Sequence, residues 1–179
     1  MLELNNSMIT FATDRFLDVE ILSDSESGLK VPLSAITTQE FFLIPKDYIT
    51  KGGSNGATGV LRETAGENGS LTTEFVATQI YQENDENYYL DDSSLRVGDH
   101  LIKPESTESY TVSQTASLTG VFNINKGYAD FKEIQILKQN DEYALIKSNT
   151  TYGLSAYDSI VLDASSVDVD QLINESIQT

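Results

Sequence analysis

The sequence of 179 residues contains no cysteine, no tryptophan and a single histidine, His100. The lack of cysteine excludes disulfide bonds, thiolate nucleophiles and structural zinc held by cysteine. A serine–histidine–acid triad would have to include His100, and the phosphate-binding motif G-x-x-x-x-G-K-[ST] is absent. A lone histidine is more typical of an ordinary strand residue than of a base or a metal ligand. We therefore assign no catalytic, cofactor-binding or metal-binding residue and predict that the protein is not an enzyme.

Basic residues are also scarce, because 11 lysines and arginines stand against 28 aspartates and glutamates, a net charge of −17. A field of this sign repels phosphate backbones and anionic headgroups, so we expect neither a nucleic-acid partner nor binding to a membrane surface. No apolar run approaches the roughly 20 residues of a membrane helix, and the first residues do not resemble a signal peptide. Either the protein is cytoplasmic, or these residues are a soluble part of an anchored protein.

What the chain does contain is a succession of short β-prone segments, clearest between Gly120 and Val167. Alternation of apolar and polar residues predicts strands, and polar turns with asparagine or glycine separate them. The strands that we expect in this region begin at Val121 and cover Phe131–Leu137, Tyr143–Ile146 and Ile160–Leu162. The turns are Asn125–Gly127 and Asn140–Glu142. The side chains that we predict to form the core are Ile136, Leu145, Ile160 and Leu162.

A looser version of the same pattern occurs earlier in the chain, which suggests an internal duplication. In this alignment Gly59 corresponds to Gly120, Ile80 to Ile136 and Asp99 to Asp158. The offset changes only in the turns, where chain length is cheap to alter. Self-similarity at a period above 50 residues is typical of a duplicated β unit. A chance likeness between two β-rich segments is the alternative.

The remaining segments complete an all-β prediction. Further strand candidates are Met8–Thr13, Phe16–Leu22, Leu29–Ile36 and Phe41–Ile44. Residues 51–59 contain four glycines and form the clearest loop. Residues 169–179 are expected to form a short helix or a tail. We predict short antiparallel strands in small barrel-like or sandwich-like units.

Acidic clusters are the only candidates for a metal site. They lie at Asp24–Gly28, at Glu83–Asn87 and at Asp91–Asp92, and their oxygens would suit calcium. None of them matches the calcium-binding loop with its bidentate glutamate, so we interpret them as solvated turns. Tyr88 and Tyr89 are a candidate platform for stacking a sugar, although neighbouring residues of one strand point to opposite faces. We therefore predict that no metal and no cofactor is required.

Several segments, taken in order, resemble the C-terminal part of HlyD-type membrane fusion proteins, the periplasmic adaptor subunits of efflux and secretion systems, and most closely the versions in Gram-positive Clostridia. They are Arg15–Leu22, Gly28–Ile36 with its V-P-x-x-A-I element, Gly120–Gly127 and Tyr152–Val161. The last resembles the family's G-L-x-x-G-D-x-V-V turn, but Tyr157 replaces the glycine; the earlier copy keeps it as Gly98. The membrane anchor, helical hairpin and lipoyl-like motif of the family are not recognisable.

This resemblance implies a specific division of the chain and a specific role. Residues 1–37 would end a β-barrel domain, residues 38–107 and 108–168 would be two membrane-proximal β units, and residues 169–179 a tail. The chain would act without enzymatic activity, outside the cytoplasm and anchored to the cell envelope through a segment that it lacks. Its partners would be a membrane transporter or envelope protein and copies of itself, although the isolated piece would be a monomer or weak dimer. The alternative is a cell-surface binding module for carbohydrate or calcium.

Overall fold

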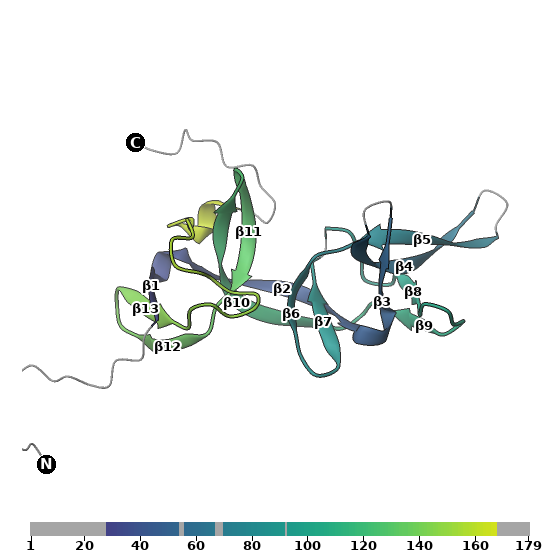
Figure 1. Ribbon diagram of the computed structural model, residues 1–179, viewed down its shortest axis with the longest axis horizontal. Coiled ribbons are helices and arrows are strands. Elements are labelled where there is room, and N and C mark those ends of the chain that lie inside the picture. Colours follow the sequence, from purple (N-terminus) through teal and green to yellow (C-terminus); the bar gives the residue numbers. More distant parts are fainter. Residues whose placement is uncertain (1–27, 54–55, 67–69, 92, 168–179) are drawn as a thin grey trace, which may run out of the picture.

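The computed structural model describes residues 28–53, 56–66, 70–91 and 93–167, and these residues form an all-β protein (Figure 1). Their only helical segments are three short 3₁₀ turns: η2 (Leu33–Ala35), η3 (Lys46–Tyr48) and η4 (Ala164–Ser166). In the part of the chain that is described, no helix has the length and apolarity to cross a membrane. The predicted all-β class is thus confirmed, whereas the strand candidates before residue 28 and the C-terminal tail lie outside the described residues.

The strands form three antiparallel sheets. The first has the order β1 (Leu29–Pro32), β13 (Tyr143–Ile146), β12 (Ile136–Gln139). The second has the order β11 (Tyr128–Glu133), β10 (Thr115–Asn125), β2 (Ile36–Pro45), β7 (Asn87–Leu90), β6 (Ile80–Glu83). Its two outer strands, β6 and β11, lie against each other, which gives this sheet a barrel-like form. The third has the order β3 (Ile49–Gly52), β4 (Ala57–Ala65), β8 (His100–Ile102), β9 (Ser109–Thr111), with β5 (Leu71–Ala77) on the free side of β4.

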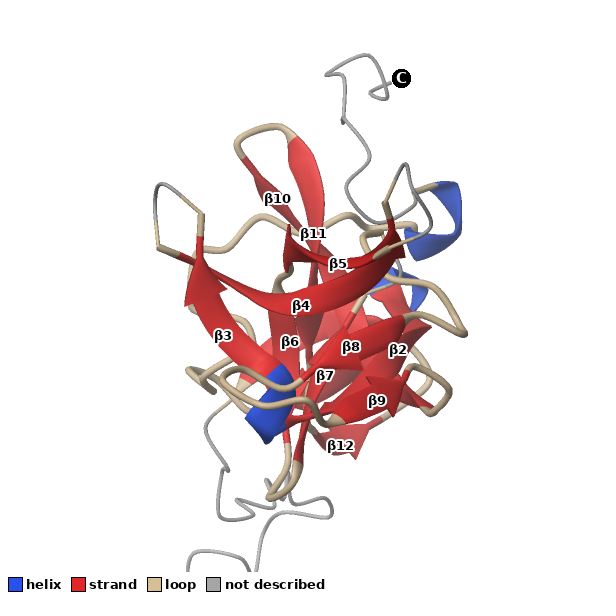
Figure 2. Ribbon diagram, turned by 90° about the vertical axis from the view of Figure 1, so that its right-hand side faces the viewer, coloured by secondary structure: helices blue, strands red, loops and turns tan. Residues whose placement is uncertain are grey.

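One β unit occurs twice in this arrangement, and one copy is inserted into the other. We call residues 41–114 the inserted unit, and residues 28–40 together with 115–167 the host unit. The strand β2 links them, because its first half pairs with β10 of the host unit and its second half with β7 of the inserted unit. Figure 1 shows β1, β12 and β13 of the host unit at one end of the molecule, and Figure 2 views the opposite end, where β3, β4 and β5 form a curved layer.

The strand registers of the two units agree pair by pair. In each unit a strand ending in proline leads into a 3₁₀ turn and then into a strand, β2 or β3, that pairs with the glycine-containing strand, β10 or β4. Ile80 and Ile136 each begin an outer strand that has a register shift after its first pair. The matching pairs, host unit first, are Leu29–Ile146 with Phe42–Leu90, Ile36–Val121 with Ile49–Val60, Gly120–Glu133 with Gly59–Ala77, and Asn123–Ile160 with Arg62–Leu101. The predicted duplication is therefore confirmed.

The turns repeat as faithfully as the strands. The side-chain oxygen of Asn84 accepts backbone N–H hydrogen bonds from Glu86 and Asn87, at 3.0 and 2.6 Å. Asn140 makes the same two bonds in the host unit, at 3.0 and 2.8 Å. An asparagine that bonds its own backbone two and three residues on fixes a tight turn without strain. These side chains explain why the hairpins β6–β7 and β12–β13 superpose in register.

Gly59 and Gly120 correspond because both strands cross a partner at very close range. A Cβ atom at Gly59 would collide with the backbone oxygen of Val76 and with the ring of Phe75. At Gly120 it would collide with the backbone oxygen of Lys132 and the ring of Phe131. Only glycine permits this approach of two backbones, so the same residue is required at the same place in both units.

Three apolar clusters hold the protein together, one in each unit and one between them. The host cluster contains Val31, Ala35, Val121, Ile134, Ala144, Ile146 and Leu154. The inserted-unit cluster contains Phe42, Ile44, Val60, Leu90, Leu95, Leu101 and Val112. The interface cluster joins Phe41 and Tyr81 of the inserted unit to Phe122, Ala129, Phe131, Ala164 and Val167 of the host unit. Each unit thus has its own core, and an aromatic contact between them fixes their relative position.

The predicted domain boundaries need correction. The boundary at residues 37/38 falls inside β2, and β1 pairs with β13, so residues 29–36 belong with the predicted second unit and not with a separate domain. The boundary at 107/108 separates β8 from β9, which pair with each other. Sequential division of the chain fails here because the host unit is interrupted in sequence by the inserted one.

The predicted core is wrong at two of its four positions. Ile136 is 41% exposed and Leu162 is 64% exposed, whereas Leu145 and Ile160 are half-buried. The predicted strand Phe131–Leu137 is in fact broken, since β11 ends at Glu133 and β12 begins at Ile136. This break turns Ile134 inward, with 5% exposure, and leaves Ile136 on the outer strand β12. The region of Ile160 contributes one isolated bridge, to Asn123, and no regular strand.

Candidate functional site

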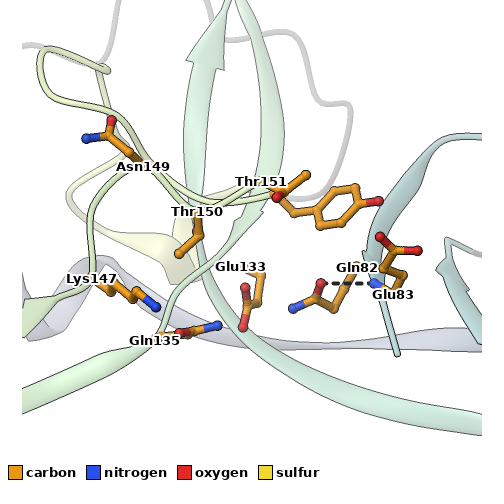
Figure 3. A pocket seen from close by; sticks show the side chains of 9 residues that line it. Gln82, Glu83, Glu133, Gln135, Lys147, Asn149, Thr150 and Thr151 are labelled. Carbon is orange, nitrogen blue, oxygen red and sulfur yellow. Dashed lines mark hydrogen bonds between the residues drawn. The ribbon is translucent and has the colours of Figure 1, made fainter. Parts of the chain in front are cut away.

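A polar cleft lies where the two units meet. Its volume is about 360 Å³. The inserted unit contributes the end of β6, and the host unit contributes the end of β11 and the loop that follows β13 (Figure 3). The lining residues are Gln82, Glu83, Glu133, Gln135, Lys147, Asn149, Thr150, Thr151 and Tyr152. Amide, hydroxyl and carboxyl groups therefore converge from three segments that are distant in sequence.

Glu133 is the most perturbed acid of this cleft. Burial raises the pKa of the Glu133 carboxyl above its ordinary value, because desolvation disfavours the charged form. A hydrogen bond with Gln82 acts in the opposite direction and lowers this pKa. Gln82 is itself held in place, since its side-chain oxygen accepts the backbone N–H of Glu83 at 2.9 Å (Figure 3). The amide group of Gln82 is thus left to face Glu133.

Glu83 connects the cleft to the surface. Its carboxylate accepts a hydrogen bond from the Lys46 ammonium at 2.8 Å, and this hydrogen bond raises the pKa of Lys46. The pKa of the Tyr152 hydroxyl is raised by burial first and by the negative charge of Glu83 second. The Lys46 ammonium and the Tyr152 hydroxyl therefore keep their protons at neutral pH. The cleft consequently offers neutral donors and acceptors beside one anchored ion pair.

The cleft is equipped to bind a polar molecule through hydrogen bonds. Three side-chain amides and several hydroxyls can each donate and accept. The described residues place no histidine in it, and a general base of ordinary strength would have to be a carboxylate. Of these residues only Glu83 was among the site candidates taken from the sequence, because separated polar side chains carry no spacing signal before the fold brings them together.

His100 lies on β8 of the third sheet, whereas the cleft is lined from β6 and β11 of the second sheet. The side chain of His100 is exposed. Its Nδ1 atom is 3.2 Å from the hydroxyl of Thr111 on the paired strand β9. This is the position of an ordinary strand residue, as predicted. The sequence also contains one G-x-S-x-G spacing, at residues 52–56, of which residues 54–55 lie outside the described residues. The strands on either side, β3 and β4, pair with each other in antiparallel fashion, which differs from the strand–helix turn of a nucleophile elbow.

The acidic segments behave differently from one another. Asp85 and its neighbours are exposed in the β6–β7 turn, as a solvated turn requires. Asp91 is instead buried, with 6% exposure, and accepts hydrogen bonds from the Tyr81 hydroxyl at 3.2 Å and the Ser93 hydroxyl at 2.9 Å. Its interpretation as a solvated residue is therefore wrong, because it supports the aromatic interface cluster. The segment at Asp24 and residue Asp92 lie outside the described residues.

Tyr88 and Tyr89 lie on opposite faces of β7, as the strand period predicts. Tyr88 packs on the inserted-unit cluster and Tyr89 on the interface cluster. They do not form a common platform for a sugar ring. Within the described ranges there is also no group of three or more His, Cys, Asp or Glu side chains placed to hold a metal ion.

A second, shallower groove lies on the inserted unit. Its lining residues are Leu61, Thr73, Ile102, Lys103, Glu105, Ser106 and Thr107. Lys103 at its edge donates to Asp47 at 2.9 Å and to Glu108 at 3.5 Å. The registers equate Leu61, Thr73 and Ile102 with Phe122, Ala129 and Val161 of the host unit. Phe122 and Ala129 belong to the interface cluster, and Val161 packs against it. The same surface is thus packed in one unit and open in the other.

Comparison of the chain with protein-family models, with curated proteins and with solved structures found no match.

Proposed function

We propose that this chain is part of an extracytoplasmic adaptor of the HlyD type, which works by protein–protein contact and not by catalysis. The observation that carries the proposal is the repeated unit itself. The V-P-x-x-A-I element, which resembles the family, forms the end of β1, η2 and the start of β2 in the host unit, and the equivalent residues of the inserted unit, Ile44–Ile49, form the end of β2, η3 and the start of β3.

The hairpins and final turns support the same proposal. Gly120–Gly127 forms the second half of β10 and the turn into β11, and Gly59 lies in β4 at the place equivalent to Gly120. The turn before Asp158 matches the turn before Asp99, because each carboxylate accepts the backbone N–H three residues earlier, from Ser155 at 2.8 Å and from Arg96 at 3.0 Å. The turn that resembles the family's G-L-x-x-G-D-x-V-V element is thus built in the same way in both units, which supports the proposal.

Two stacked β units with separate cores suit a spacer that positions partners. A spacer protein needs a rigid frame and surfaces that contact its partners, and these surfaces need no catalytic nucleophile. The partners in this proposal are a membrane transporter and further copies of the adaptor. The envelope location follows from the family resemblance alone.

The test uses the full-length protein in its own cells. If the protein is an adaptor, detergent-solubilised membranes should yield a complex of the full-length protein with a transporter encoded beside its gene. Deletion of the gene should reduce export by that transporter, and a copy expressed from a plasmid should restore it. Unchanged export in the deletion strain, together with the absence of a complex, would rule out this role.

The polar cleft favours a second candidate, a binding module for carbohydrate. Its amides and hydroxyls match the hydroxyl groups of a sugar, and Tyr152 supplies an aromatic ring. Titration of oligosaccharides followed by heteronuclear NMR would locate binding. Shifts confined to the cleft and abolished by Gln82→Ala would favour this candidate, whereas shifts spread over the surface would count against it. The calcium form of this alternative gains no support from the described residues.

A further inference from the structure

The two units differ at one equivalent strand. In the inserted unit β6 lies against β11 of the host unit, and Tyr81 on β6 is 4% exposed, with its ring 4.9 Å from that of Phe41 and 6.4 Å from that of Phe131. The equivalent strand of the host unit is β12. Its residue equivalent to Tyr81 is Leu137, which is 37% exposed, and its neighbour Ile136 is 41% exposed.

The strand β12 is also an outer strand of its sheet. It pairs with β13 on one side, and all four of its residues are exposed. Outer strands with exposed apolar side chains are sites where another chain can pack. The host unit therefore presents the same apolar strand that the inserted unit buries in the interface cluster.

The receiving surface is also present twice. Within the chain, β6 lies against the hairpin β10–β11, whose Phe122 and Ala129 are fully buried. The equivalent hairpin β4–β5 of the inserted unit has no such cover among the described residues, and Leu61, Thr73 and Ile102 line the open groove there. Leu71 of β5 is 69% exposed. Within the described part of the chain, one unit therefore carries an uncovered donor strand and the other an uncovered acceptor groove.

These two surfaces lie at opposite ends of the molecule (Figure 1), so they do not meet within one copy. We propose that they meet between copies: β12 of one protein packs against β5 and the Leu61–Thr73–Ile102 groove of the next, in the way that β6 packs against β11 within the chain. The occupant of the groove is thus a second copy of this chain. One contact accounts for both open surfaces, and its geometry already exists inside the molecule.

Local charge favours this contact although the net charge opposes it. β12 carries Lys138 and no acidic residue. The groove is lined by Glu105 and by Lys103, and the charge of Lys103 is already paired with Asp47 and Glu108. The net charge of −17 on each copy still resists association, and the donor is a single strand of 4 residues, whereas stable complexes need roughly 1,000 Å² of buried surface. We therefore expect weak association that strengthens with added salt, because salt screens the overall repulsion. Because donor and acceptor differ, the contact is head-to-tail and extends to rings or open chains.

This contact would join copies of the adaptor to one another, so its biological meaning rests on the proposed adaptor function. The experiment measures self-association alone, so its failure would leave binding to a transporter untouched.

Sedimentation equilibrium of the chain 1–179 should show a weight-average mass that rises with concentration, and more steeply at high salt. Leu137→Glu on the donor and Thr73→Glu on the acceptor should each reduce the association constant by about tenfold or more. Val97→Glu adds the same charge at a residue that is 70% exposed and lies outside both surfaces, and it should change little.

Mixing the two variants distinguishes the head-to-tail contact from a symmetric one. Leu137→Glu retains an intact groove and Thr73→Glu retains an intact strand, so their mixture should form a one-to-one complex that neither forms alone. If β12 instead paired with β12 of another copy, Thr73→Glu would associate like the unmodified chain and the mixture would gain nothing, which would overturn the proposal. A chain that stays monomeric at all concentrations, while Leu137→Glu lowers its melting temperature, would also overturn it by showing that β12 is covered from within the same chain.

Discussion

Tyr157 holds in the host unit the backbone conformation that Gly98 holds in the inserted unit, with φ values of +75° and +94°. Each residue directly precedes the aspartate that closes its turn, Asp158 or Asp99. Glycine adopts this region freely, whereas a residue with a Cβ atom is strained there. The side chain of Tyr157 is fully exposed and offers no visible packing in return. The duplication has therefore left one copy of the turn strained.

We expect Tyr157→Gly to stabilise the protein. Relief of the left-handed conformation contributes about 1 kcal/mol, part of which is lost to the greater flexibility of glycine in the unfolded chain. Gly98→Ala is the matched control, since a Cβ at Gly98 meets no atom within 4 Å and its cost is purely conformational. It should destabilise by a similar amount. Urea denaturation measures both changes, and a destabilised Tyr157→Gly variant would show that the exposed ring has a role that the structure does not display.

The corrected core predicts a clear contrast between two aliphatic residues. Ile146 is fully buried in the host cluster and pairs with both Leu29 and Ile136. Ile146→Ala should cost about 2–5 kcal/mol, from lost burial and the cavity that remains. Leu162→Ala, at a residue that is 64% exposed, should cost less than about 0.5 kcal/mol. Equal shifts of the two denaturation midpoints would contradict the placement of these side chains.

The pH dependence of stability tests the cleft. The folded pKa of Glu133 is raised by burial above the unfolded value, so the folded state binds more protons in the window between the two. In that window stability falls as pH rises, and at neutral pH the ionised carboxylate is a constant cost. Glu133→Gln removes the charge and keeps an acceptor for Gln82. We expect a higher melting temperature than that of the unmodified protein at neutral pH and no difference below the ordinary carboxyl pKa.

Glu74→Gln is a suitable control for this measurement, because Glu74 is exposed and accepts a hydrogen bond from Arg62 at 3.1 Å. Its loss should not raise stability at neutral pH. If Glu133→Gln and Glu74→Gln gave the same pH profile, the carboxyl of Glu133 would be solvated like a surface group. The effect on ligand binding is separate, since thermal unfolding is measured without any ligand.

The sequence was sufficient for the strand class and for the duplication, because Gly59 and Gly120 are required by close backbone contacts and Asn84 and Asn140 by turns. It was insufficient for the insertion. The repeated strand–3₁₀–strand segments, Val31–Ile36 and Ile44–Ile49, are short and differ in their middle residues. The strand β2 joins the units without a turn or a glycine. A boundary that falls inside a continuous strand leaves no compositional signal.

The misplaced core has a different origin. Alternation predicted that Ile134 and Ile136 share one face of a strand, but the chain leaves the sheet between Glu133 and Ile136 and the register shifts after Ile136. Either irregularity reverses which residues face inward. The cleft was missed for a third reason. Gln82, Glu133 and Asn149 become neighbours only when the inserted unit docks on the host unit, and no local pattern marks them beforehand.

The separate clusters predict that the inserted unit folds alone. Every member of its buried cluster, from Phe42 to Val112, lies within residues 41–114, and its sheet β3–β4–β8–β9 uses no strand of the host unit. What it loses on excision is the cover over Phe41 and Tyr81. We expect a peptide of residues 41–114 to unfold cooperatively, at a lower temperature than the whole chain, and to bind a dye that reports exposed apolar surface. Replacing both exposed aromatics, as in Phe41→Thr with Tyr81→Thr, should reduce dye binding while dispersed amide signals persist in NMR spectra. Collapsed signals in both peptides would mean that the interface cluster, and not the inserted-unit cluster, is what stabilises this half of the molecule.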